Sequence, residues 1–230
     1  MSDPSATVRN AVMYLVALVL SICVHEYGHA VLADKLGDPL PRAQGRVTLN
    51  PLAHIDLIGT IAFPLAGFFL SATGSALGAY VVGWGKPVQV SLSARHMTRR
   101  FDTRTSHMFI ALAGPGMNIL FAGLISGLYV GMIRGGVEVE LANALLPVVA
   151  MNIGLAFFNL IPCPPLDGGA VLRGLLPRSM DYVSDFLDRY GYMIFIVLLV
   201  TQTLRVILYP AAVLAALWQR ELVQLALGQG

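Results

Sequence analysis

Five long apolar blocks dominate this chain, at residues 9–34, 57–83, 106–133, 143–162 and 186–209. A helix needs about 20 apolar residues to cross a bilayer, and four of these blocks read as transmembrane helices of about that length. Only 12% of the residues are charged, against about 25% in a soluble domain, so polar side chains are too few to cover a particle in water. The blocks predict an all-α polytopic membrane protein.

The second block, 57–83, differs from the others because it contains residues that weaken or break a helix. These residues are Pro64, Gly67, Gly74 and Gly78. Basic residues flank the block on both sides, in 35–56 and 84–105, and basic loops favour the cytoplasmic side of a membrane. A single span would place one of the two basic segments outside. We therefore predict a re-entrant hairpin over 57–83, with a single span as the alternative because the charge rule is a bias.

The remaining blocks take alternating directions if the hairpin is correct. The first helix runs from outside to inside, and the next two uninterrupted blocks run outward and inward again. The block at 186–209 then exits. The tail after Pro210 is either a short final span or an amphipathic helix at the interface, and the charges of Arg220 and Glu221 favour the interface.

A small β element is expected at the membrane surface. Residues 42–50 alternate weakly between polar and apolar side chains, which predicts a short strand, and residues 88–92 are its expected partner. The exposed edge of such a strand could pair with an extended peptide.

The first block carries the pattern His25-Glu26-x-x-His29. A spacing of four residues places both imidazoles on one face of a helix, where two ring nitrogens can reach one zinc at about 2.0–2.1 Å. Glu26 projects to the side of the metal, where it can polarise a bound water. A charge near the bilayer centre costs about 2.5–3.5 kcal/mol, so three ionisable residues in one span indicate a polar cavity. The alternative is a helix end whose residues are merely solvated at the cytoplasmic interface.

A zinc with two histidines and a water lacks one protein ligand of the usual catalytic set. The best candidate is Asp167, in segment 159–169 with the sequence NLIPCPPLDGG. The prolines break the preceding helix, and a membrane tolerates such a break only where it lines a cavity or packs in protein. In the predicted topology His29 and Asp167 both lie at cytoplasmic ends of parallel helices, where they can meet. Taken alone, Asp-Gly-Gly is also an ordinary turn signal.

Three motifs, in this order and at these spacings, resemble the site-2 protease family of intramembrane zinc metalloproteases. They are the His-Glu-x-x-His span, segment 114–118 with the sequence GPGMN, and segment 159–169. The resemblance covers most of residues 10–175. The lack of an inserted PDZ-like domain, together with segment 50–56, is similar to the compact members of the family.

The resemblance implies a set of roles for individual residues. His25, His29 and Asp167 correspond to the ligands of one Zn²⁺ per chain, and Glu26 corresponds to the catalytic base. It also implies hydrolysis of peptide bonds within or near the transmembrane segment of a substrate. We expect a single membrane protease domain over residues 1–230, with a catalytic core at about 9–175 and C-terminal helices at about 180–227.

Other polar residues allow two interpretations each. Asn159 could hydrogen-bond a substrate or stabilise a developing oxyanion, or it could join helices. Asn118 faces a similar choice, and the neighbouring Gly114 and Gly116 favour packing or substrate positioning. His54 could approach the metal or simply cap the predicted hairpin.

The predicted function is therefore an intramembrane zinc metalloprotease. The alternative is a non-proteolytic membrane protein that binds or transports metal, which would be expected to carry several intramembrane acidic sites or His-rich loops. The net charge of +2 argues against a nucleic-acid partner, so the expected partners are the lipid bilayer and a membrane-protein substrate with a transmembrane helix. We expect the bacterial cytoplasmic (inner) membrane, with the active site toward the cytoplasmic side.

Overall fold

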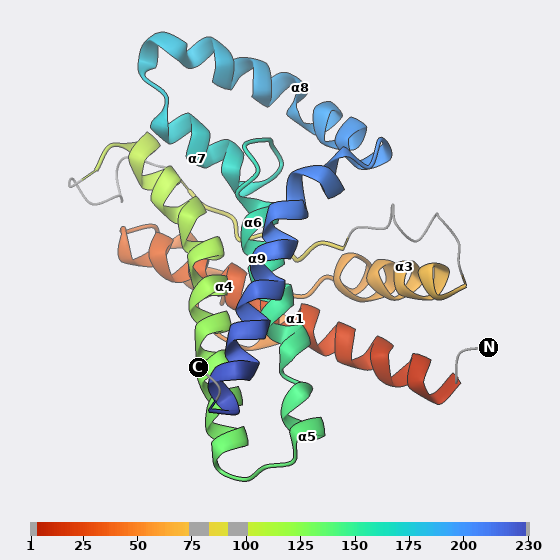
Figure 1. Cartoon of the computed structure of the whole chain (residues 1–230). Coiled ribbons are helices and arrows are strands. Elements are labelled where there is room, and N and C mark those ends of the chain that lie inside the picture. Colours follow the sequence, from red (N-terminus) through yellow and green to blue (C-terminus); the bar gives the residue numbers. More distant parts are fainter. Residues whose placement is uncertain (1–3, 74–82, 92–100, 229–230) are drawn as a thin grey trace.

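A computed structural model of the chain describes residues 4–73, 83–91 and 101–228 (Figure 1). Every regular element in these ranges is a helix, and four helical stretches are long and apolar enough to cross a membrane. They are α1 (Pro4–Lys35), α4 (Thr103–Arg134), α5 with α6 (Val139–Asn143 and Leu146–Asn159) and α9 (Thr203–Ala226). The predicted all-α polytopic architecture is confirmed.

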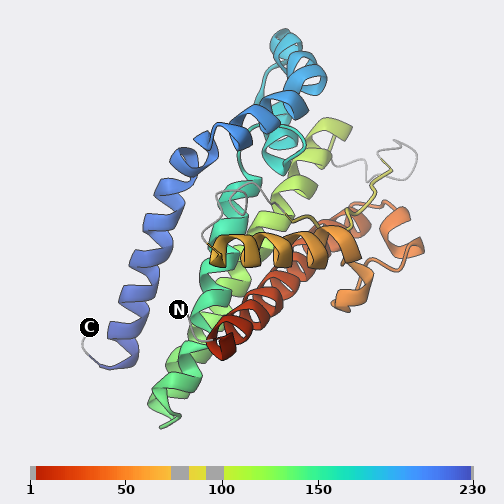
Figure 2. The same cartoon turned by 90° about the vertical axis from the view of Figure 1, so that its right-hand side faces the viewer.

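Helices α4, α6 and α9 run side by side, and α1 crosses them obliquely (Figures 1 and 2). Small residues allow this close packing. Ala122, Val149 and Ala215 form one buried cluster among these three adjacent helices. Where α1 meets α4, a Cβ built on Gly28 would lie 2.5 Å from the carbonyl oxygen of Ala113, so the backbones of the two helices touch there.

The C-terminal part differs from the expected path. The block at 186–209 does not form one helix, because Gln202 adopts a left-handed conformation with φ of 59° and separates α8 (Asp181–Val200) from α9. Helix α8 is not among the four candidate spans and lies across one end of the bundle, beside α7 (Asp167–Leu175) (Figure 1). The fourth candidate span is instead α9, which continues through Pro210 and contains the tail.

The second apolar block starts as a π-helical segment, η2 (Leu57–Ala62), and continues as α3 (Phe63–Ala72). This helical stretch is shorter than the candidate spans. The chain returns to its starting point, because the Trp84 N–H donates to the carbonyl oxygen of Gly59 at 3.0 Å. Residues 74–82 of the predicted hairpin lie outside the described part.

Residues 42–50 do not form the strand expected there. Prolines 39 and 41 favour a helix start, and α2 (Leu40–Ala43) takes the first two positions of the expected strand, followed by turns and bends. The Arg46 guanidinium bonds to the carbonyl oxygens of Ala53 and Lys86, so side-chain bonds replace a ladder. Residues 88–91 have no regular secondary structure and no partner strand in the described chain, and residue 92 lies outside it. Two short 3₁₀ helices, η1 (Pro51–Ala53) and η4 (Arg178–Met180), complete the described elements.

Candidate metal centre

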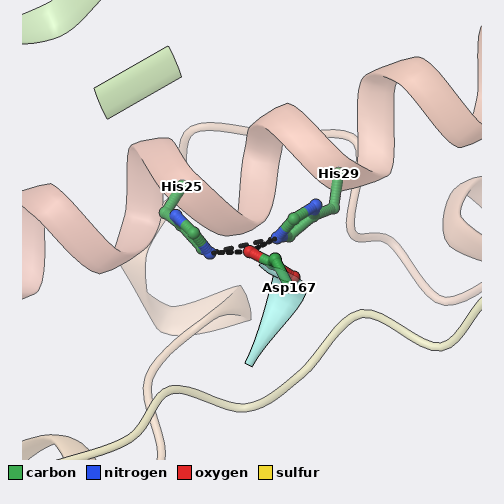
Figure 3. A group of neighbouring side chains, drawn as sticks. All are labelled: His25, His29 and Asp167. Carbon is green, nitrogen blue, oxygen red and sulfur yellow. Dashed lines mark hydrogen bonds and ion pairs between the residues drawn. The ribbon is translucent and has the colours of Figure 1, made fainter. Parts of the chain in front are cut away.

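The three predicted ligands meet at one point (Figure 3). His25 and His29 project from one face of α1, and Asp167 is the first residue of α7. The two Nε2 atoms lie 3.0 Å apart, and the Asp167 Oδ2 lies 3.2 Å from that of His25 and 3.3 Å from that of His29. Ligands held tetrahedrally at about 2.0–2.1 Å from a zinc are about 3.3 Å apart, so the triangle has the size of a zinc site.

The hydrogen bonds of the imidazoles show that the three converging atoms are electron-pair donors. His25 Nδ1 faces the Asn118 Oδ1 at 2.7 Å, and His29 Nδ1 faces the carbonyl oxygen of Ile110 at 2.7 Å. Both partners only accept, so each Nδ1 carries the proton and each neutral Nε2 presents a lone pair. Two lone pairs and a carboxylate oxygen about 3 Å apart repel one another unless a cation lies between them. The donor set therefore fits a metal ion.

The carboxyl of Asp167 is ionised in this environment. Burial alone would raise the pKa of Asp167, but positive charge at this point outweighs burial and lowers the pKa well below its usual value, whether that charge comes from protons on the imidazoles of His25 and His29 or from a bound cation. Ionised carboxylates are the form that binds metal ions.

A buried polar network orients the first ligand. The Asn118 amide donates to the carbonyl oxygen of Ser21 at 2.9 Å and to the Asn152 Oδ1 at 2.7 Å, which fixes its own Oδ1 toward His25. The Asn152 amide in turn donates to the Ser21 hydroxyl at 2.8 Å. These three side chains are fully buried and join α1, α4 and α6. This orienting role of Asn118 was not among the roles expected for it, although polar residues inside apolar spans were a usable signal.

Glycines make room for the ligands. A Cβ built on Gly114 of α4 would overlap Nε2 of His29 and would lie 2.7 Å from Cε1 of His25. A Cβ on Gly168 would overlap the carbonyl oxygens of Leu160 and Ile161, because the segment after α6 doubles back over the start of α7. The proline break therefore brings Asp167 to α1 only because Gly114 and Gly168 leave room for the close contacts that this requires.

A cavity of about 870 Å³ opens beside the three ligands, between α1, residues 83–90, α4, the end of α6, α7 and α8. Glu26 lines it and is buried, and its Oε2 accepts a hydrogen bond of 3.0 Å from the Val88 N–H. Asn159 also lines the cavity, and its amide donates to the carbonyl oxygen of Leu155 at 3.0 Å. The Glu26 carboxylate, a polar amide and a metal-sized triangle of potential ligand atoms thus share one space.

His54 does not join this group. It is fully buried, and its Nε2 bonds to the carbonyl oxygen of Thr48 at 2.8 Å. The metal-sized cluster in the described residues consists of His25, His29 and Asp167. The structure thus gives His54 a contact within its own loop.

Comparisons with known proteins agree with this geometry. The sequence model of Peptidase family M50 matches residues 13–145 and 135–202. The protein named "Putative zinc metalloprotease YwhC" of Bacillus subtilis (strain 168) is 32% identical over 204 residues, which cover 85% of this chain and 84% of that protein. "Putative zinc metalloprotease Rip2" of Mycolicibacterium smegmatis is 27% identical over 202 residues, with 87% and 71% covered. No solved structure matches the chain significantly. The chain therefore belongs to peptidase family M50, the site-2 protease family of intramembrane zinc metalloproteases.

Proposed function

We propose that this chain hydrolyses peptide bonds within or near the transmembrane segments of membrane-protein substrates, at a zinc held by His25, His29 and Asp167. The observation that carries the proposal is the convergence of two imidazole lone pairs and one carboxylate oxygen within 3.3 Å of one another. The apolar span that supplies two of these ligands gives the site its place in the membrane.

The zinc and the residues around it have separate roles in the proposed hydrolysis. When bound, zinc lowers the pKa of a water to about 7 and polarises a carbonyl group. Glu26 takes the proton of the attacking water, whose oxygen bonds to the carbonyl carbon. Glu26 then gives that proton to the leaving nitrogen as the C–N bond breaks. Asn159 keeps one amide hydrogen beyond its bond to Leu155, and this hydrogen can contact the substrate carbonyl oxygen.

The substrate must be extended to expose its peptide bonds, and residues 83–91 supply a suitable edge. The N–H groups of Trp84, Lys86 and Val88 donate hydrogen bonds to other parts of the chain. Their acceptors are, in that order, Gly59, His54 and Glu26. In an extended chain the alternate backbone groups point the other way. We propose that these alternate groups, the N–H groups of Gly85 and Gln89 and the carbonyl groups beside them, receive an unwound substrate strand in place of residues 42–50; Pro87 has no N–H to contribute.

The zinc site is proposed to face the cytoplasm of a bacterial inner membrane. Five described basic residues lie in the segment from α7 to α8 or at the starts of α4 and α9, and two lie at or near the opposite ends of α4 and α9. The first group is Arg104, Arg173, Arg178, Arg189 and Arg205, and the second is Arg134 and Arg220. Basic residues favour the cytoplasmic side. The bond between residues 59 and 84 also supports a second apolar block that re-enters from that same side.

Cysteine labelling tests this orientation. In a background with Cys23 and Cys163 replaced by alanine, Glu138→Cys is expected to react with an impermeant maleimide in intact cells. Gln44→Cys is expected to react only after the cells are permeabilised, because both side chains are exposed but lie at opposite ends. The reverse pattern would place the zinc site on the outer side.

Removal of the third ligand tests the function. Asp167→Ala is expected to lower the zinc content from one ion per chain to near zero, and to abolish cleavage of a panel of single-span proteins. The reason is that two imidazoles alone leave the ion without its anionic ligand. Zinc is measured by atomic absorption, helical content by circular dichroism, and cleavage by mass spectrometry.

Asp188→Ala is the matched control for this experiment. Asp188 lines the same cavity but pairs with Arg173, so its loss leaves the three ligands in place. If Asp167→Ala kept its zinc, Asp167 would not be a ligand. If wild-type protein bound zinc and cleaved no member of a broad panel, the protease proposal would fail.

A further inference from the structure

Residues 83–91 form a segment without regular secondary structure beside the metal centre, which we call the strap. Three backbone amides fix it in place. The Trp84 N–H donates to the carbonyl oxygen of Gly59 at 3.0 Å, and the Lys86 N–H donates to that of His54 at 2.8 Å. The Ser91 N–H donates to the buried carboxylate of Asp38 at 2.6 Å. The strap is therefore held at both ends by bonds that do not involve the zinc ligands.

The middle of the strap makes a bond of a different kind. The Val88 N–H continues the alternation of Trp84 and Lys86, but its acceptor is the Oε2 of Glu26, at 3.0 Å. Among the described residues, the group that donates a hydrogen bond to the Glu26 carboxylate is the Val88 N–H. Glu26 is only 9% exposed, so few other donors are available to the oxygen that Val88 holds.

Gly85 allows the strap to reach Glu26. A Cβ at Gly85 would lie 2.6 Å from the Cγ2 of Ile22 on α1, and 3.5 Å from the Oε1 of Glu26. The strap therefore lies against α1 directly over the carboxylate. Oε2 of Glu26 accepts a hydrogen bond from the strap, and Oε1 lies beside Gly85, which has no side chain.

A glutamate side chain that carries a proton between two positions must keep one geometry. It has three rotatable bonds, and fixing a long side chain costs conformational entropy. A donor fixed in the strap can hold one oxygen and leave the other free for proton transfer.

We infer that the backbone N–H of Val88 is a positioning group for Glu26, so that the strap sets the geometry of the catalytic base. The inference rests on the proposed function, because it takes Glu26 as that base. The role belongs to a backbone amide, so the type of side chain at position 88 does not indicate it.

An amide-to-ester exchange tests the inference without changing a side chain. Replacing residue 88 by the α-hydroxy acid of valine removes the N–H and keeps the side chain. The same exchange at Trp84 is the matched control, because it removes a 3.0 Å bond of the same strap whose acceptor is Gly59. Both proteins are made at full length, and cleavage of a labelled single-span protein is followed beside wild type.

The expected result is a fall in kcat of about 10- to 100-fold for the exchange at Val88 relative to the exchange at Trp84, the range for a hydrogen bond to a charged group. Zinc content and the visible spectrum of the cobalt-substituted protein should be unchanged in both, because the ligands are untouched. Gly85→Ala is a second variant that keeps every N–H, and it should also lower kcat because its methyl group pushes the strap away from α1.

Equal kcat values for the two exchanges would overturn the inference. A higher kcat for the exchange at Val88 would also overturn it, because the bond would then restrain the base instead of positioning it. A wild-type protein that binds zinc but cleaves nothing would overturn the proposed function, and this inference with it. Failure of the two ideas is thereby distinguished within one experiment.

Discussion

Glu26→Gln is expected to lower peptide-bond hydrolysis by about 10²–10⁴-fold or more while the zinc content stays at one ion per chain. Glutamine cannot accept the proton of the attacking water, but it has almost the same shape as glutamate and can still accept the Val88 N–H through its amide oxygen. The ligand atoms of His25, His29 and Asp167 are unchanged. Cleavage of a single-span protein, measured beside zinc content, separates loss of the base from loss of the metal.

Glu138→Gln is the control for this experiment, because it makes the same chemical change at an exposed position between α4 and α5. It should cleave like wild type. Full activity in the Glu26→Gln protein would show that another group takes the proton. The inactive protein also retains the binding site, so it can be used to capture a substrate for identification by mass spectrometry.

Gly114→Ala is expected to abolish zinc binding, and cleavage with it. The added methyl group would overlap Nε2 of His29 and would lie 2.7 Å from Cε1 of His25, so it would displace the imidazoles from their converging positions. The imidazoles cannot simply retreat, because Asn118 and Ile110 hold their other nitrogens at 2.7 Å. Zinc content of the purified protein, measured by atomic absorption, checks the prediction.

Gly116→Ala provides a closely matched control. A Cβ at Gly116 meets nothing within 4 Å, and the residue lies two positions away in the same helix. Both substitutions gain about 1 kcal/mol of helix propensity, so any difference between them comes from the contacts of the added methyl group. Stoichiometric zinc binding by the Gly114→Ala protein would contradict the geometry of the site.

The sequence was sufficient to predict which three side chains converge, because each of them left a local signal. The four-residue spacing of His25 and His29 places both on one face of a helix whatever the tertiary structure. Asp167 follows a proline cluster, and such a break inside an apolar block must be shielded by protein. The long apolar blocks likewise indicated α1, α4 and α6, because the length of a span depends on bilayer thickness alone.

The partners of these ligands could not be predicted, because they depend on how helices pack. Asn118 lies 93 residues from His25 in the chain, and the partner of His29 is the main-chain oxygen of Ile110, which has no side-chain signature. The strand over 42–50 failed because weak alternation was outweighed by two prolines that start a helix. The division between α8 and α9 depends on Gln202, a residue type that rarely adopts a left-handed conformation.

The network of Ser21, Asn118 and Asn152 also fixes the axial positions of three helices relative to one another. It connects three helices at a single level, so sliding any one of them along its axis would break several buried hydrogen bonds at once. Each broken bond leaves a buried polar group without a partner, at a cost of about 1–3 kcal/mol. His25 therefore takes its position from two helices to which it does not belong. A change in the packing of α6, far along the chain from the histidines, would reach the metal through this connection.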